Sequence, residues 1–508
     1  MKIYRFVLFI LFFLSIKAYT QTSEDYFNSG FAKSQQLDFE AAIIDFTKAI
    51  SLDATFAEAY NHRGIANRYL KKYQVAITDY TKAIEIHPHY AEAYNNRGVV
   101  KHQIQLYQSA LEDYNRAIQL NSMYAEVYNN RGVTKHVLRD FQSALADFTK
   151  AIDIDPKYAE AYNNRGVTRF QLEQYTEAIA DYNTALAIKL SYAQVYFNRG
   201  LANRKSNELN EAIADYTKAL EFTPQLAEAY NNRGVAKVKL EDYRGAIADY
   251  NSAIDVNPSY TKAYYNRGIV KMMLLDYQGA IIDYNRALEL NSNDAETYNN
   301  RGICKESVND YQGALIDYNK AIELNPSFSE AYNNRGVLYR KMNNYKAAMA
   351  DYDKLLVLTP KNAEAYYHRG IVKYYISDLS GSITDFTQAI TFNSQLFEAY
   401  MYRGIVKNML NDFSGAILDY NEAIKLNPES AEAYYNRGVS KGRLQEHQSS
   451  IEDFTQAMNY KMNYAEAIFN RGVSYLALAQ KDAACADFSK ASQLGFYKAF
   501  EVIAVFCK

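Results

Sequence analysis

Apolar and polar positions recur along this chain with a period of 34 residues. Thirteen units of that length follow one another from residue 23 to residue 464 without an inserted or deleted residue, and a fourteenth begins at Ala465. A single inserted residue would rotate every later helical position by about 100° around the helix axis. The constant length therefore predicts that each unit is one structural repeat, built from helices that must keep their faces in register.

Four columns of the repeat have nearly constant residue types. With Ala91 counted as position 1 of the third unit, position 8 is glycine in all fourteen units and position 24 is always tyrosine or phenylalanine. Position 20 is alanine in twelve units and position 27 is alanine in thirteen. All seven prolines, Pro88 among them, occupy position 32. Because proline breaks a helix interior, its confinement to one column predicts helices elsewhere, and the small residues allow those helices to pack closely.

These columns resemble the tetratricopeptide repeat family, whose pattern has an aromatic residue at positions 4 and 24, glycine at 8, alanine at 20 and 27, and proline at 32. The resemblance covers about 480 residues. It implies an all-α fold in which each 34-residue helix-turn-helix repeat holds two antiparallel helices, at positions 1–14 and about 15–31. Such repeats stack into a right-handed superhelical α-solenoid with a concave groove. The implied organisation is fourteen tandem repeats at residues 23–496 and a C-terminal capping helix at 497–508.

The first twenty residues differ from the repeats. Lys2 and Arg5 precede an apolar run at residues 6–16, and a short polar stretch follows it. This order is typical of a secretory signal peptide at residues 1–20, and the run is shorter than the roughly 17–25 residues that span a bilayer. An uncleaved anchor is the alternative. We expect export to the periplasm, the cell envelope or the medium, with no integral membrane span in the mature chain.

Two charged columns fall on the inner faces of the predicted helices. Position 7 is arginine in thirteen units and position 23 is aspartate in all fourteen. On a helical wheel both lie with the packed residues, and a buried guanidinium needs an anionic partner, so we predict partly buried ion pairs. Representative members are Arg97, Arg131 and Arg165, with Asp113, Asp147 and Asp181. Whether a pair closes within or between repeats stays open, and arginines that bind ligand phosphate or carboxylate in the groove are the alternative.

Position 6 is asparagine in eleven units and lies on the predicted concave side. An amide both donates and accepts hydrogen bonds, so a column of amides could hold an extended peptide by its backbone. This column is similar to the asparagine ladder of O-linked N-acetylglucosamine transferases. The candidates for peptide binding are Asn96, Asn130, Asn164, Asn198, Asn232, Asn266, Asn300, Asn334 and Asn436, with Asn28 and Asn470 nearer the ends. In the recurring string YNNRG, we expect Asn95 and Asn96 to face outward; simple tolerance of asparagine at an exposed site is the alternative.

Ligand selectivity is expected from the groove-facing columns that vary, chiefly positions 12 and 13. Apolar and aromatic side chains occur at these two positions and also near His368 and Tyr402, where position 6 is not asparagine. Such groups of side chains on a concave surface are typical of a binding hot spot. The hot-spot candidates are Met272, Met273, Tyr367, His368, Tyr374, Tyr375 and Tyr402. Contact between neighbouring helices is the alternative explanation. Arg68, Arg204 and Arg340 add basic residues at a spacing of four repeats.

Composition and motifs argue against several other classes of protein. The net charge is −2 without a run of five like charges, which is unlike a nucleic-acid-binding protein. Nucleotide-binding, serine-hydrolase and zinc-protease motifs are absent, so we expect no enzyme activity, no metal and no cofactor. Cys485 and Cys507 flank a predicted helical turn that would bring them close enough for a disulfide, whereas Cys304 is expected to be a packed residue.

The sequence therefore predicts an exported, non-enzymatic scaffold that binds a protein or peptide ligand in the concave groove of its superhelix. The alternative is a carbohydrate or envelope-polymer binder, in which groove tyrosines stack on sugars and asparagines hydrogen-bond to them.

Overall fold

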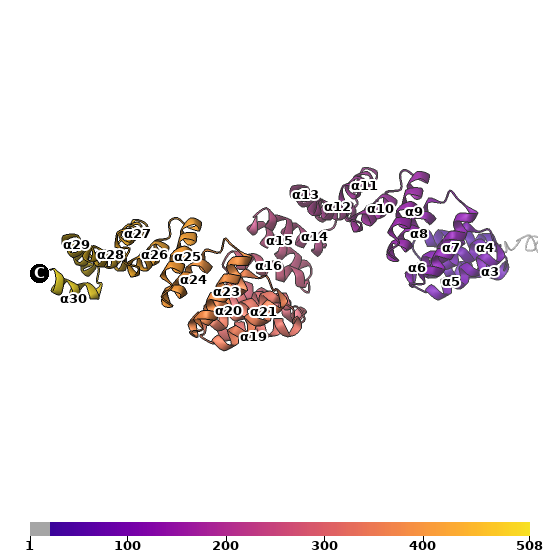
Figure 1. Ribbon diagram of the computed structural model, residues 1–508. Helices are drawn as coiled ribbons and strands as arrows, with labels where there is room; N and C mark the ends of the chain where they lie inside the picture. Colours follow the sequence, from indigo (N-terminus) through magenta and orange to yellow (C-terminus); the bar gives the residue numbers. More distant parts are fainter. Residues whose placement is uncertain (1–20, 508) are drawn as a thin grey trace, which may run out of the picture. The chain divides into compact units, whose positions relative to one another are not determined.

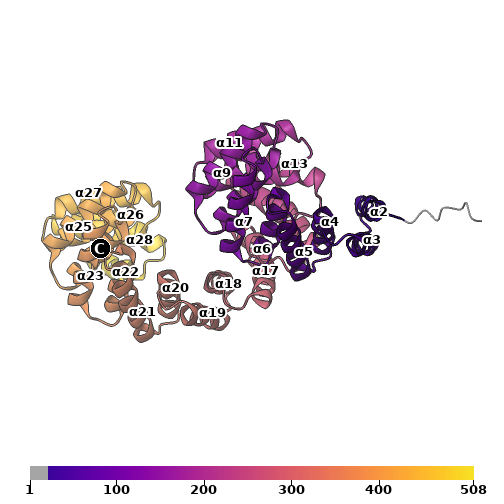
Figure 2. The same ribbon diagram turned by 90° about the vertical axis from the view of Figure 1, so that its right-hand side faces the viewer.

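The computed structural model describes residues 21–507, so the predicted signal peptide lies outside the described residues. Every regular element in the described range is an α-helix, and the chain divides into two compact units, Met1–Tyr260 and Thr261–Lys508 (Figure 1). In these units, repeats 1–7 and 8–14 respectively form helical hairpins that stack in chain order. Successive hairpins turn about an axis, so that α7, α9, α11 and α13 of the first unit lie around one ring (Figure 2). The predicted all-α solenoid is confirmed.

The helices of the first unit are α2 (Ser23–Gln35), α3 (Phe39–Leu52), α4 (Ala57–Tyr69), α5 (Tyr73–Ile86), α6 (Ala91–Gln103), α7 (Tyr107–Leu120), α8 (Ala125–Val137), α9 (Phe141–Ile154), α10 (Ala159–Gln171), α11 (Tyr175–Ile188), α12 (Ala193–Lys205), α13 (Leu209–Phe222), α14 (Ala227–Lys239) and α15 (Tyr243–Val256). Those of the second unit are α16 (Thr261–Met273), α17 (Tyr277–Leu290), α18 (Ala295–Ser307), α19 (Tyr311–Leu324), α20 (Ser329–Lys341), α21 (Tyr345–Leu358), α22 (Ala363–Tyr375), α23 (Leu379–Phe392), α24 (Phe397–Met409), α25 (Phe413–Leu426), α26 (Ala431–Arg443), α27 (His447–Tyr460), α28 (Ala465–Ala477), α29 (Lys481–Gln493) and α30 (Tyr497–Phe506).

The two helices of a repeat occupy positions 1–13 and 17–30, slightly less than the sequence predicts. The first helix ends early because position 15 adopts a left-handed backbone conformation, as at Gln105 with φ 65°. The N–H of Gln105 donates to the carbonyl of His102, and that of Leu106 donates to the carbonyl of Lys101. These bonds satisfy the free carbonyls of the helix end and turn the chain back into the second helix.

The core of each repeat is an aromatic ring that packs directly on a helix backbone. A Cβ added to Gly98 would lie 2.7 Å from Cε1 of Tyr114, closer than any ordinary carbon contact. Ala110 and Ala117, on the same helix as Tyr114, are fully buried as well. Position 8 is therefore glycine because the ring at position 24 takes the space of a side chain, and the alanines keep the neighbouring helices close.

The C-terminal helix α30 covers the last repeat with Ala499 and is tied to α29 by a disulfide between Cys485 and Cys507, whose Cα atoms lie 5.6 Å apart. Its outer face carries exposed Tyr497 and Val505, so the predicted cap is apolar on the solvent side. Cys304 is fully buried, and burial raises the pKa of its thiol to about 12. Among the described helices, none combines the length and apolar character needed to cross a membrane.

Candidate functional site

The arginine column lies between helices. Arg97 on α6 donates from Nε and Nη2 to the carboxylate of Asp113 on α7, at 3.0 and 2.7 Å. Its Nη1 donates to Oγ1 of Thr81 on the preceding repeat, at 3.0 Å, and its guanidinium lies over the ring of Tyr94. Lys101 Nζ reaches the same carboxylate at 2.8 Å. The Arg97–Asp113 pair thus closes within a repeat, while the remaining arginine nitrogen joins that repeat to its predecessor.

The other representative pairs have the same geometry. Arg131 lies 2.6 Å from Asp147, and Arg165 lies 2.7 Å from Asp181. In both pairs Nη1 donates to position 25 of the preceding repeat. These guanidinium groups are directed at acceptors of the chain itself, so the polar groups that line the groove come from other columns.

One ion pair of the second unit has a weaker environment. In repeat 10 (residues 329–362), position 11 is Tyr339, and Arg335 is the partner of Asp351 at 2.6 Å. Burial raises the pKa of Asp351, and the hydrogen bond from Arg335 only partly opposes that shift. The buried carboxylate of this repeat therefore depends on a single arginine.

The asparagine ladder, defined as the asparagines at position 6, bonds along the solenoid. In seven of these residues the amide donates from Nδ2 to the side chain at position 5 of the preceding repeat. The bonds to an asparagine carbonyl are Asn96 to Asn61 (3.1 Å), Asn130 to Asn95, Asn164 to Asn129, Asn198 to Asn163 and Asn334 to Asn299 (each 3.0 Å). Asn300 and Asn470 instead donate to the hydroxyls of Tyr265 and Tyr435, and Asn232 donates to the carbonyl of Glu228. Asn266 and Asn436 are half-buried at the same position, and Asn28 is exposed.

The expectation that Asn95 faces outward is wrong. Asn95 is 1% exposed, because position 5 lies between the first helices of successive repeats. Its Nδ2 donates to Glu126 Oε1 at 3.2 Å, and its Oδ1 accepts from Asn130. A wheel drawn for one helix places positions 5 and 6 on the same side, but the next repeat covers position 5. Asn96 is itself buried, at 9% exposed, whereas position 6 is partly exposed in other repeats, as at Asn130 and Asn164.

The ladder is interrupted between repeats 10 and 11. On α22, His368 replaces the asparagine that would donate to Asn333 on α20. The Oδ1 of Asn333 and the Nδ1 of His368 are both buried without a hydrogen-bond partner from the described chain. Burial, with a smaller contribution from Arg340, lowers the pKa of His368 to about 4. A cavity of about 350 Å³ lies over this stretch, with Asn299, Asn333 and Asn334 in its wall.

Aromatic side chains gather beside the interruption. The ring centroids of Tyr367 and Tyr402 are 6.0 Å apart, and those of Tyr374 and Tyr402 are 6.2 Å apart, both with edge-to-face geometry. His368 lies 5.1 Å from Tyr367. We call Tyr367, His368, Tyr374 and Tyr402 the aromatic cluster. The Nε of Arg340, which acts electrostatically on Tyr367 and Tyr402, is buried without a partner as well.

The remaining hot-spot candidates lie at the edge of the cluster or on another repeat. Tyr375 touches Tyr374 but is half exposed and stacks on Tyr345. Met272 and Met273 belong to repeat 8, where Met272 packs against a core that includes Cys304 and Met273 is exposed. Sequence reasoning missed Asn333. The signal that could have revealed it is His368, which stands at position 6 where an asparagine would have donated to Asn333.

Sequence profiles of the tetratricopeptide repeat match residues 91–124, 125–158, 227–260, 261–294 and 295–328, and also 148–180 and 317–350. A further TPR repeat profile matches residues 66–105, 166–206, 200–240, 338–376 and 409–445. The chain belongs to the tetratricopeptide repeat family. It is thus a helical scaffold of a kind that mediates protein–protein contacts. A search of curated protein sequences finds no significant match.

Solved tetratricopeptide repeat structures resemble parts of the chain. YrrB, described as a TPR protein with an unusual peptide-binding site, is 25% identical over 36% of this chain and 95% of its own, with a TM-score of 0.33. A tetratricopeptide repeat protein from Parabacteroides merdae is 22% identical over 49% of this chain and 98% of its own, with a TM-score of 0.38. Yeast Tom70 is 18% identical over 84% and 96%, with a TM-score of 0.34. At these TM-scores the similarities carry no functional inference.

Proposed function

We propose that this tetratricopeptide repeat protein is an exported scaffold that binds an extended segment of a partner protein along the first helices of repeats 9 to 12. The observation that carries the proposal is the interruption of the asparagine ladder. Three buried polar atoms there, Asn333 Oδ1, His368 Nδ1 and Arg340 Nε, have no partner within the described chain. Asn333 lines a cavity, His368 belongs to the aromatic cluster, and Arg340 acts electrostatically on tyrosines of that cluster. Export is supported by the signal-peptide pattern at residues 1–20.

Unpartnered polar atoms are costly in a folded protein. A buried donor or acceptor that lacks a partner costs about 1–3 kcal/mol, so native structures leave few of them unsatisfied. A peptide backbone offers both missing partners, because its N–H can donate to Asn333 and its carbonyl can accept from Arg340. Both side chains are only partly buried, and Asn333 already lines the cavity, so a bound segment can approach them from the groove.

The aromatic cluster supplies the apolar part of the same site. Tyr367, Tyr374 and Tyr402 are each partly exposed and present ring faces and edges from neighbouring repeats. Aromatic anchors of this kind dominate many protein interfaces. With the cationic Arg340 beside them, the site favours a segment in which an apolar or aromatic residue is close to an acidic one.

The rest of the ladder supplies a weaker, sequence-independent contact. Asn130 and Asn334, which bond to the preceding repeat through Nδ2, are partly exposed, and each has a carbonyl oxygen and a second N–H besides that bond. These groups can hold a peptide backbone without reading its side chains. We therefore place affinity along the ladder and selectivity at its interruption.

The test selects binders from a displayed peptide library and measures their affinities for single variants of the full chain. His368→Asn gives Asn333 back its donor, so it should weaken selected peptides roughly tenfold, the effect of one lost polar contact with its anchor, while thermal stability stays equal or rises. Arg340→Met should weaken acidic peptides most. Met273→Ala, on repeat 8, is the matched control and should leave affinity unchanged.

Two results would contradict the proposal. Equal affinities of the selected peptides for the wild type, His368→Asn and Arg340→Met would show that binding does not involve the interruption. A glycan array that yields binders, with a peptide library that yields none, would favour the carbohydrate alternative.

A further inference from the structure

Position 12 of repeat 13, which faces repeat 14, is a glycine and so has no side chain. That position holds His102 in repeat 3 and His136 in repeat 4, but Gly442 in repeat 13, on α26. A Cβ added to Gly442 would meet only Ser450 Oγ, at 3.4 Å, which is an ordinary contact. The space that a side chain fills elsewhere is thus open here.

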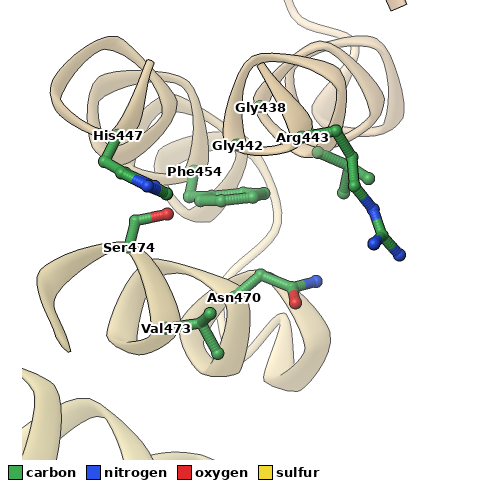
Figure 3. A pocket seen from close by; sticks show the side chains of 9 residues that line it. Gly438, Gly442, Arg443, His447, Phe454, Asn470, Val473 and Ser474 are labelled. Carbon is green, nitrogen blue, oxygen red and sulfur yellow. The ribbon is translucent and has the colours of Figure 1, made fainter. Parts of the chain in front are cut away.

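A pocket of about 310 Å³ occupies this space. Its walls come from α26, α27 and α28, and include Gly442, His447, Phe454, Asn470 and Ser474 (Figure 3). His447 and Ser474 point toward each other beside the ring of Phe454, whereas Arg443 extends away from them. We call this space the Gly442 pocket. Its volume lies at the lower end of the roughly 300–1,000 Å³ found for ligand sites, a size suited to a single large side chain.

Repeats 3 and 4 show what fills the equivalent place. The imidazole of His102 lies 5.3 Å from the ring of Tyr107, at position 17, with edge-to-face geometry. Its Nδ1 is 2.9 Å from Oγ1 of Thr134, at position 10 of the next repeat. His136 makes the same two contacts, with Phe141 and with Thr168. A ring at position 12 therefore contacts one ring and one hydroxyl.

Both of those partners are present in the Gly442 pocket without the ring between them. His447 occupies position 17, and Ser474 occupies position 10 of the next repeat. The Nδ1 of His447 is buried without a partner from the described chain. Ser474 Oγ has a single long contact, 3.3 Å from Ser450 Oγ. A polar pair and an aromatic wall thus surround a space shaped for an imidazole.

We propose that the Gly442 pocket receives a histidine side chain of a bound protein, which takes the place that His102 and His136 occupy in their own repeats. The ring would lie against Phe454 and His447, and one of its nitrogens would share a hydrogen bond with Ser474. This inference rests on the proposed function in that the ring belongs to a bound polypeptide. The pocket can nevertheless be tested with free rings, independently of any peptide.

The probe is 4-methylimidazole, the side-chain analogue of histidine, titrated into the full chain and followed by NMR. The wild type should bind it near His447 and Ser474. Gly442→His refills the pocket from within and should abolish this binding while raising the melting temperature. His102→Gly opens the equivalent space in repeat 3 and should create a second site near Tyr107 and Thr134.

The hydrogen bond has its own readout. Ser474→Ala removes the hydroxyl without filling the pocket and should weaken 4-methylimidazole about fivefold, as expected for one neutral hydrogen bond, but should leave toluene binding unchanged. Toluene that binds the wild type as tightly as 4-methylimidazole would overturn the assignment of a histidine. Ring binding that persists in Gly442→His, or in a Gly442→Phe variant, would overturn the pocket itself.

The two proposals can fail separately. Peptides that bind at repeats 9 to 12 should keep that contact in Gly442→His. The pocket fails if free 4-methylimidazole does not bind to the wild type, whatever the peptides do. If 4-methylimidazole binds and no peptide does, the pocket stands and the scaffold function fails.

Discussion

Repeats 3–5 and repeats 10–12 differ in the hydrogen bonding of the side chains at positions 5 and 6. In repeats 3–5 each position-6 asparagine donates to a buried position-5 asparagine, so the amides satisfy one another, as Asn130 and Asn95 do. In repeats 10–12 the column changes to His368 and Tyr402, and Asn333 loses its donor. His368 replaces an asparagine whose bond would join two repeats. One group on each repeat, Asn333 Oδ1 and His368 Nδ1, is therefore left without a partner in the described chain.

The buried ion pair of repeat 10 also has fewer contacts than its equivalent in repeat 4. Asp147 is held by both Arg131 and Lys135, at 2.6 and 2.7 Å. Asp351 is held by Arg335, with Tyr339 at the position of the lysine. Repeat 10 thus lacks the second cation that repeats 3–5 have, whereas repeats 11 and 12 keep it as Lys373 and Lys407.

Removal of the arginine from each pair should give the largest difference between the regions. Arg335→Met leaves the 4% exposed carboxylate of Asp351 without a cation and should lower the local free energy of unfolding by about 3–5 kcal/mol. Arg131→Met should lower it clearly less, because Lys135 stays beside Asp147. Native-state hydrogen exchange in α21 and α9 measures both losses. Equal losses would show that the lysine column contributes nothing.

Acid should destabilise the second region through His368. Its folded pKa of about 4 lies below the ordinary 6.5, so the folded repeat binds fewer protons than the unfolded chain. Stability is therefore fully present above about pH 6.5 and falls as the pH drops toward 4, by as much as about 3 kcal/mol. Asp351 has a raised pKa, and its protonation acts in the opposite direction. The test therefore measures the pH dependence of hydrogen exchange in α22 for the wild type and subtracts that for His368→Asn. Equal pH dependence in the two proteins would show that His368 does not cause the loss of stability in acid.

The asparagine ladder should matter more for stability than the aromatic residue that replaces it. Asn96→Ala leaves the fully buried Oδ1 of Asn61 without its donor, at a cost of about 1–3 kcal/mol. Tyr402→Phe keeps the ring contacts with Tyr367 and should change stability by less than about 0.5 kcal/mol. Thermal melts and hydrogen exchange of both variants provide the comparison. A neutral Asn96→Ala would mean that water or a relaxed backbone replaces the ladder bond.

The smallest expected difference concerns the outer link between repeats. Arg131 Nη1 donates to Asn115, and Arg369 Nη1 donates to Asp353, each at 2.7 Å and on an exposed side. Asn115→Ala should cost roughly 0.5 kcal/mol, and Asp353→Ala roughly 1 kcal/mol, because the second bond joins two charges. Only the Asp353 effect should shrink as salt rises from 0.1 to 1 M, which screens exposed charges. Equal salt dependence of the two variants would contradict this explanation.

Periodicity was sufficient to predict the solenoid because 34-residue spacing, a glycine at position 8 and a ring at position 24 describe contacts inside one hairpin. The Gly98 backbone and the Tyr114 ring meet within a single repeat, where sequence distance and spatial distance go together. The same reasoning put Arg97 and Asp113 in one layer, and the structure pairs them there. The candidate site was predicted less completely, because its contacts cross from one repeat to the next.

The amino-acid order alone thus determined the repeat, its helices and the columns that face the core. The tertiary structure decided which polar atoms in those columns have partners: it buried Asn95, left Asn333 and His368 unsatisfied, and opened a pocket at Gly442. The reason is that hydrogen-bond satisfaction depends on distances between side chains that are 31 to 35 residues apart, as in the bonds from Asn95 to Glu126 and from Asn130 to Asn95. A helical wheel gives directions around one helix, and only the stacking of neighbouring repeats turns those directions into distances.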